Sequence, residues 1–210
     1  MENLFFDFDG TIADSEPGIV NSLKYAVAQL KMKELTESEY RTFIGPPIAE
    51  SLRVHYPELD DQQLKVAAKV YHERYVTEGK FDLVIFDDFE ETLQTLKSMD
   101  YKLYTASAKP VEVLTEILNY FDLAQYFDGI YGATEQFPAK TEILNYAMEV
   151  TGSKQTNSVM IGDTMNDIIG GQNNAVKTLG VTYGFGEVTG ADVIVDSPIK
   201  IIAGVQEIFS

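Results

Sequence analysis

Two aspartates stand one residue apart near the start of the chain, directly after an apolar run. The segment reads Leu4-Phe5-Phe6-Asp7-Phe8-Asp9-Gly10-Thr11. Apolar residues ahead of a turn signal predict a buried strand, and open α/β sheets place their ligand sites at the carboxyl ends of such strands. An Asp-Gly turn explains Asp9 but not Asp7, because an unpaired charge at the end of an apolar strand is costly. We therefore expect two carboxylates that share a cation and handle a phosphate.

A second acidic cluster repeats this pattern later in the chain. The apolar run Ser158–Ile161 leads into Gly162-Asp163-Thr164-Met165-Asn166-Asp167. Asp163 and Asp167 share a face if a helix begins early, although acidic residues near a helix start are also ordinary caps. Carboxylates that converge repel one another unless a cation neutralises them, and oxygen ligands without His or Cys favour Mg²⁺. Mg²⁺ leaves coordination positions for a substrate phosphate, which favours phosphoryl chemistry.

Between the two acidic clusters lie residues that could hold a phosphate. Ser107 follows an expected strand and can donate from its hydroxyl, although a serine there is also a common turn or cap residue. Lys140 stands at an expected helix start, where a cation is unfavourable for the helix dipole, so its position needs another reason. Lys109 is a weaker candidate, because a lysine is by default a surface residue.

Composition narrows the function classes. The 210 residues carry a formal charge of -17, which disfavours nucleic acid and anionic membranes as partners. An anionic substrate would therefore need positive charge supplied within its own site. The chain contains no cysteine, which excludes disulfides and thiol chemistry. It starts without a signal-peptide pattern, which favours a cytoplasmic location. Both histidines, His55 and His72, lie far from the acidic clusters, so a histidine base is not expected.

The elements that must position these residues alternate between strands and helices. After the first strand, a helical stretch runs from about Ser15 to Gly79, broken at Gly45-Pro46-Pro47 and at Pro57. Beyond it, strands are expected at 101–106, 129–132, 158–161, 177–181 and 192–195, and helices at 90–99, 111–121, 141–150 and 167–174. Such alternation predicts an α/β fold with a largely parallel sheet covered on both faces.

These residues together resemble the haloacid dehalogenase superfamily of phosphatases. The first motif matches Asp7-Phe8-Asp9-Gly10-Thr11, the second Ser107, the third Lys140, and the fourth Gly162-Asp163-Thr164 with Asp167. The resemblance implies a Rossmann-like α/β core of residues 1–14 and 81–210. It also implies an inserted helical cap domain of residues 15–80.

Further residues resemble the phosphoglycolate-phosphatase-like branch, which includes 5′-nucleotidases and pyrophosphatases. They are Phe43-Ile44-Gly45-Pro46-Pro47 and Gly129-Ile130-Tyr131-Gly132-Ala133. Two positions depart from the common pattern: Thr141 stands where relatives often carry proline, and Ser107 replaces the commoner threonine. Neither change removes a needed functional group.

The resemblance implies a mechanism and roles for the site residues. Asp7 would attack the phosphorus, and Asp9 would protonate the leaving group and then activate water. Mg²⁺ would bind to the Asp7 carboxylate, the Asp9 backbone carbonyl and Asp163, with Asp167 in support. The phosphate would be held by Ser107, Lys140 and backbone N–H groups. Expected substrate contacts comprise Phe8, Gly10, Thr11, Ser107, Ala108, Lys109 and Lys140.

The expected activity is hydrolysis of a small phosphorylated metabolite, by a monomer or homodimer. Phosphoglycolate, a nucleoside monophosphate and pyrophosphate all stay open as substrates. A phosphosugar mutase would use the same Asp7 but return the phosphate to a sugar. A dehalogenase would not need the acid at Asp9. A non-enzymatic phospho-aspartate switch would lack the large helical insertion.

Overall fold

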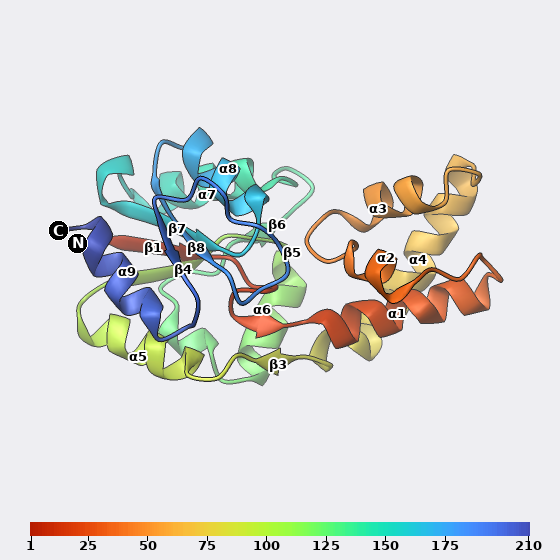
Figure 1. Cartoon of the computed structure of the whole chain (residues 1–210), viewed down its shortest axis with the longest axis horizontal. Helices are drawn as coiled ribbons and strands as arrows, with labels where there is room; N and C mark the ends of the chain where they lie inside the picture. The colour runs from red at the N-terminus through yellow and green to blue at the C-terminus, as the bar shows by residue number, and fades with distance from the viewer. The chain divides into compact units, whose positions relative to one another are not determined.

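The computed structural model describes all residues from Met1 to Ser210 (Figure 1). The chain forms two compact units. One combines Met1–Asp14 with Ile85–Ser210, and the other is the continuous segment Ser15–Val84. The second boundary thus lies four positions later than the expected one, at 84 rather than 80. The role of the helical unit as a cap domain stays a prediction.

A five-stranded sheet forms the centre of the first unit. In spatial order its strands are β4 (Lys102–Thr105), β1 (Asn3–Phe6), β7 (Ser158–Gly162), β8 (Lys177–Val181) and β9 (Val193–Val195). Every neighbouring pair is parallel, with Phe5 opposite Tyr104 on one side and Met160 on the other. Parallel sheets of this kind need both faces covered, which fits the complete burial of β1. The predicted parallel α/β fold is confirmed.

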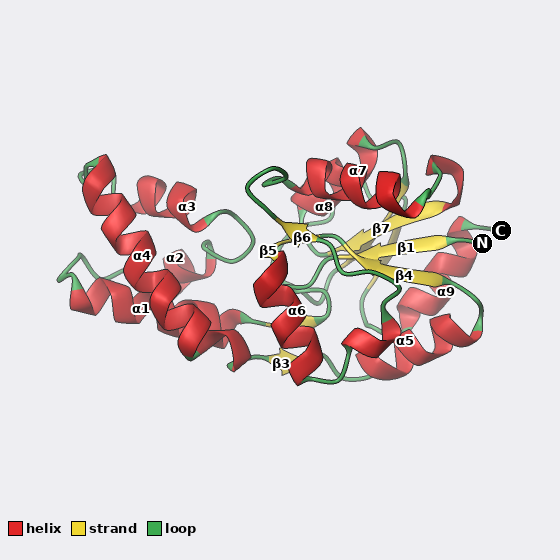
Figure 2. Ribbon diagram, turned by 180° about the vertical axis from the view of Figure 1, so that it is seen from behind, coloured by secondary structure: helices red, strands yellow, loops and turns green.

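Helices cover both faces of this sheet. Figures 1 and 2 show α7 (Lys140–Thr151) and α8 (Met165–Asn173) on one face, and α5 (Phe89–Ser98) and α9 (Lys200–Ile208) on the other. Helix α6 (Val111–Tyr120) follows the strand that carries Ser107, a candidate phosphate-binding residue. Because all strands run in one direction, their carboxyl ends meet at one edge of the sheet. That edge is where the acidic clusters lie.

The helical unit contains α1 (Glu16–Gln29), α2 (Glu37–Arg41), α3 (Ile48–His55) and α4 (Asp61–Thr77). The expected breaks are confirmed, because Gly45-Pro46-Pro47 separates α2 from α3 and Pro57 separates α3 from α4. Capping boxes begin α2 at Thr36 and α4 at Asp60. The core of the unit includes Tyr40 and Tyr56, both fully buried.

Several short elements complete the fold. They are β2 (Ala13–Asp14), β3 (Val84–Ile85), β5 (Ser107–Pro110), β6 (Gly132–Ala133) and the 3₁₀ turns Gly79–Phe81, Ala124–Tyr126 and Gln155–Asn157. The predicted strand at 129–132 is wrong in extent: only a single bridge joins Gly129 to Tyr104, and β6 begins at Gly132. Helix α9 and strand β5 were not among the expected elements. None of the helices combines the length and apolar character needed to cross a membrane.

Candidate active site

The ends of two adjacent strands bring the acidic clusters together. Asp7 directly follows β1, and its N–H donates to the carbonyl of Ile161 in β7 at 2.9 Å. Asp163 directly follows β7. One carboxylate oxygen from each of Asp7, Asp163 and Asp167 lies within 4.8 Å of the other two, and all three residues are buried. The expected convergence of the two clusters is therefore present in the fold.

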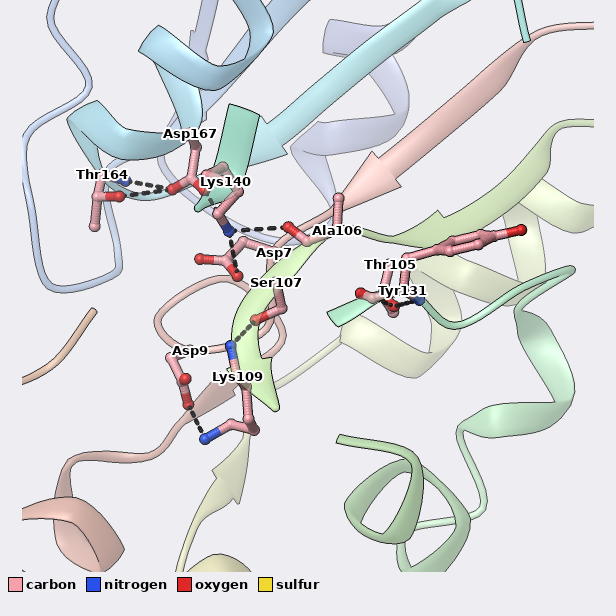
Figure 3. A network of polar contacts seen from close by, with 10 residues as sticks. All are labelled: Asp7, Asp9, Thr105, Ala106, Ser107, Lys109, Tyr131, Lys140, Thr164 and Asp167. Carbon is pink, nitrogen blue, oxygen red and sulfur yellow. Dashed lines mark hydrogen bonds and ion pairs between the residues drawn. The ribbon is translucent and has the colours of Figure 1, made fainter. Parts of the chain in front are cut away.

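Lys140 provides the positive charge at the centre of this cluster. Its Nζ lies 2.7 Å from Asp7 Oδ1 and 2.8 Å from Asp167 Oδ1, and it donates to the carbonyl of Ala106 at 2.9 Å (Figure 3). Burial would lower the pKa of Lys140, but the charges of Asp167 and Asp7 outweigh burial and raise it. These contacts explain why a lysine is the first residue of α7. Its expected contact with a phosphate stays a prediction.

Asp167 is both a helix cap and a member of the cluster. Thr164 precedes α8 and donates to Asp167 Oδ2 from its backbone N–H at 3.0 Å and from its hydroxyl at 2.8 Å. Asp167 Oδ1 faces Lys140. Because α8 begins only at Met165, Asp163 lies before the helix, and the early helix start that a shared face would need is absent. The two carboxylates meet instead because the chain turns between β7 and α8.

Asp163 has two oxygens in different environments. Oδ2 accepts a hydrogen bond of 2.7 Å from the backbone N–H of Phe185, whereas Oδ1 is buried without a hydrogen-bond partner. Burial, followed by the negative charges of Asp7 and Asp167, raises the pKa of Asp163 to about 8. A carboxylate that is buried, crowded by two others and unpartnered on one oxygen is poorly stabilised by the protein alone.

The oxygen donors of this cluster fit a hard divalent cation. Of the three carboxylates in the cluster, only Asp7 and Asp167 pair with Lys140, so one lysine is set against three acidic groups. Asp163 Oδ1 is buried without a hydrogen-bond partner, and the cluster contains no nitrogen or sulfur ligand to favour a softer metal. Asp7 and Asp163 have the donors to hold such an ion, with Asp167 beside them. The expected contact through the Asp9 backbone carbonyl stays a prediction.

Asp9 lies outside the carboxylate cluster and pairs with a second buried lysine. Lys109 Nζ lies 3.1 Å from Asp9 Oδ1, and the Lys109 side chain is only 4 % exposed. The same ammonium lies 5.6 Å from the centre of the Phe8 ring. Lys109 is thus no surface lysine, contrary to its default interpretation. The site supplies two buried positive charges within a strongly acidic protein.

The remaining expected contact residues surround these pairs. Ser107 is buried, and its Oγ accepts a hydrogen bond from the Lys109 N–H at 3.3 Å (Figure 3). Ala108 lies between them in β5. The N–H groups of Gly10 and Thr11 donate to Ala13 and Phe8 carbonyls within the loop itself. These two N–H groups stabilise the turn, and their expected substrate contacts stay predictions.

Two residues that contact the acidic strand ends were not among the predicted site residues. Tyr183 donates its hydroxyl to the carbonyl of Thr11 at 2.9 Å, and Phe185 provides the N–H that Asp163 accepts. Both belong to the segment Tyr183-Gly184-Phe185-Gly186 after β8. The sequence offered one indication of these contacts, the alternation of aromatic residues with glycine in this segment, but such glycines are equally typical of an ordinary turn.

The parallel sheet and its carboxylate cluster define an α/β protein with a candidate ligand site at the carboxyl ends of its strands. The chain matches the family model described as haloacid dehalogenase-like hydrolase over residues 4–181. It therefore belongs to this family and is a hydrolase. The resemblance inferred from the four motifs is confirmed.

Individual relatives agree with this membership. The chain is 33 % identical over 186 residues to a 5′-nucleotidase of Pseudomonas aeruginosa, covering 88 % of this chain and 84 % of the relative. It is 28 % identical over 213 residues to a phosphoglycolate phosphatase of Vibrio vulnificus, covering 94 % and 92 %. The crystal structure of a predicted phosphatase from Clostridium acetobutylicum is similar at a TM-score of 0.91 and 33 % identity, covering 98 % of both chains.

Proposed function

We propose that this chain is a Mg²⁺-dependent phosphatase that hydrolyses a small phosphomonoester through a phosphoenzyme on Asp7. The observation that carries the proposal is the buried cluster of Asp7, Asp163 and Asp167, in which Lys140 pairs with Asp7 and Asp167. The names of the relatives support phosphate-ester hydrolysis as the reaction class.

Asp7 is the proposed nucleophile. Its carboxylate oxygen would form a bond to phosphorus while the bond from phosphorus to the leaving oxygen breaks. Lys140, 2.7 Å from Asp7 Oδ1, would hold this carboxylate in place and offset charge on the phosphoryl oxygens. A bound Mg²⁺ would supply electrostatic stabilisation of that charge. The buried Ser107 hydroxyl is the proposed donor to a phosphoryl oxygen.

Asp9 is the proposed proton carrier. It would give a proton to the leaving oxygen, and then take one from the water that attacks phosphorus. The second attack breaks the bond between phosphorus and Asp7 and releases inorganic phosphate. Asp9 is paired with Lys109 at 3.1 Å in the structure. Proton donation would therefore require the carboxyl group of Asp9 to leave the ammonium.

The substrate proposal is a small phosphorylated metabolite of the phosphoglycolate type, with a nucleoside 5′-monophosphate as the alternative. Relatives of both names cover more than four fifths of the chain. By the family resemblance, the helical unit of residues 15–84 would act as the cap domain that sets substrate choice. Rates of phosphate release from 2-phosphoglycolate, adenosine 5′-monophosphate and pyrophosphate decide between these substrates.

Replacing Asp7 with asparagine tests the mechanism. We expect Asp7→Asn to lose at least about 10³-fold in kcat, because an amide oxygen is a poor nucleophile. Its circular dichroism spectrum should match that of the wild type. Activity within tenfold of wild type would contradict the role of Asp7. Separately, full activity in excess EDTA would contradict the metal assignment.

A further inference from the structure

One short loop after β8 contacts both halves of the site. The Tyr183 hydroxyl donates to the Thr11 carbonyl at 2.9 Å, in the loop that carries Asp7 and Asp9. Two residues later, the Phe185 N–H donates to Asp163 Oδ2 at 2.7 Å. The segment Tyr183–Gly186, here called the bracket loop, therefore connects the first acidic strand end to the second.

Two glycines allow the bracket loop to lie this close. A Cβ at Gly184 would lie 2.3 Å from the Gly10 carbonyl oxygen and 2.4 Å from Asp163 Oδ2. A Cβ at Gly10 would lie 2.0 Å from Asp163 Oδ2 and 2.8 Å from Phe185 Cδ2, and Gly10 also has a φ of +77°. No methyl group fits between the bracket loop, the Gly10 turn and Asp163.

Packing against Phe86 orients the Tyr183 side chain toward the Thr11 carbonyl. Its ring packs edge-on against Phe86, with 4.9 Å between ring centres. Only Thr182 separates the loop from β8, and β8 pairs with β7 from Val159 to Gly162. The bracket loop is therefore anchored to the same sheet that carries Asp163.

The hydrogen bond from Phe185 determines which oxygen of Asp163 is left for another ligand. Oδ2 is occupied by the N–H, and Oδ1 is buried with no hydrogen-bond partner. A donor on one oxygen fixes the plane of a carboxylate and thereby the direction of the other oxygen. Asp163 has an oxygen within 4.8 Å of oxygens of Asp7 and Asp167, and Oδ1 is the oxygen that the Phe185 N–H leaves without a hydrogen bond.

We propose that the bracket loop is a positioning element for the divalent-cation site. The Phe185 N–H orients Asp163. Tyr183 and Gly184 hold the turn at Gly10 close to Asp163. This inference rests on the proposed function, because it takes the carboxylate cluster to be a cation site. Neither Tyr183 nor Phe185 is assigned a catalytic role.

The test compares two glycine substitutions in the full-length protein. Gly184→Ala introduces a methyl group against Gly10 and Asp163. Gly204→Ala, in α9, introduces one 2.7 Å from Leu179 Cδ1 in the apolar core, away from the cluster. The readout is Mg²⁺ binding to the metal-free protein by titration calorimetry, without substrate, alongside the thermal midpoint.

We expect only Gly184→Ala to lose metal affinity, whatever change each methyl group makes to the thermal midpoint. Loss of a group that orients a metal ligand weakens binding by about 10- to 100-fold, so Gly184→Ala should bind Mg²⁺ at least about tenfold more weakly. Gly204→Ala should stay within about twofold of the wild type. Equal Mg²⁺ affinity in the two variants would overturn the proposal, because a purely structural loop predicts that outcome.

A second pair keeps the proposal testable if Gly184→Ala does not fold. Tyr183→Phe removes the hydroxyl that reaches Thr11, and Tyr126→Phe removes one that bonds Glu90 and Gln94 at the surface. We expect weaker Mg²⁺ binding, by about threefold or more, only in Tyr183→Phe. Unchanged affinity there would overturn the proposal. If the wild type itself binds no Mg²⁺, the metal in the proposed function fails first.

Discussion

Lys140 should contribute more to stability than any surface lysine, because two buried carboxylates depend on it. Its Nζ lies 2.7 Å from Asp7 Oδ1 and 2.8 Å from Asp167 Oδ1, and its side chain is 6 % exposed. Lys140→Met keeps the length of the side chain and removes its charge. The two carboxylates are then left buried beside Asp163 with no cation.

The expected loss of folding free energy follows from the burial of these two ion pairs. Removing one partner of a buried ion pair costs about 3–5 kcal/mol. The cost of two pairs is not doubled, because a carboxylate without its cation takes up a proton instead of staying charged. We therefore expect a loss of about 3–5 kcal/mol, and a fall of about 10 °C in thermal midpoint for a chain of this size.

The assay is urea unfolding of the metal-free protein at neutral pH. Far-ultraviolet circular dichroism suits this chain, which has no tryptophan. Lys177→Met is the matched control: Lys177 lies 2.7 Å from Asp192 Oδ1 but is 61 % exposed. Exposed pairs contribute about 0–1 kcal/mol, so the control should lose no more than that. Equal losses in the two variants would refute the argument from burial.

Two further predictions concern pH. Burial, then the charges of Asp7 and Asp167, raises the pKa of Asp163 to about 8, so the folded metal-free protein holds a proton that the unfolded chain has released. Its stability should fall as pH rises from about 4 to 8, by at most about 1.4 kcal/mol per pH unit, and Asp163→Asn should remove that slope in urea titrations in EDTA. Burial would raise the pKa of Asp128, but hydrogen bonds from Lys102, Lys97 and the Leu103 N–H lower it. Asp128→Asn should lose about 1–2 kcal/mol at neutral pH, and this loss should shrink as pH falls below about 4, the ordinary pKa of an aspartate; a constant difference across pH would contradict this.

The meeting of the two acidic clusters could be predicted because it depends on pattern and topology alone. Apolar runs that end in aspartate identify strands and their carboxyl ends, and a parallel sheet brings those ends to one edge. That reasoning places Asp7 near Asp163 without any knowledge of side-chain conformation. The helix breaks at Gly45-Pro46-Pro47 and Pro57 were predictable for a different reason: proline restricts the backbone at its own position, whatever the rest of the fold.

The rest of the site depends on contacts that residue types do not encode. The pairing of Lys109 with Asp9 depends on β5. The Ser-Ala-Lys-Pro sequence of this strand is too short to show a sustained alternation of apolar and polar residues from which a strand could be predicted. The hydrogen bond from Phe185 to Asp163 uses a backbone N–H, which every residue except proline offers. Asp167 was open to two interpretations, as cap or site residue, and the structure gives its two oxygens one role each.

The position of β1 in the sheet has a consequence for how the chain is made. This strand is synthesised before both of its neighbours, yet it lies between β4 and β7, whose residues Lys102 and Ser158 pair with Asn3. At about 5–20 residues per second, β1 waits on the order of 10–30 s for its second neighbour. Throughout that interval Leu4, Phe5 and Phe6 have no complete sheet to enter. We therefore expect the nascent chain to carry an unpaired, aggregation-prone apolar segment until β7 has been synthesised.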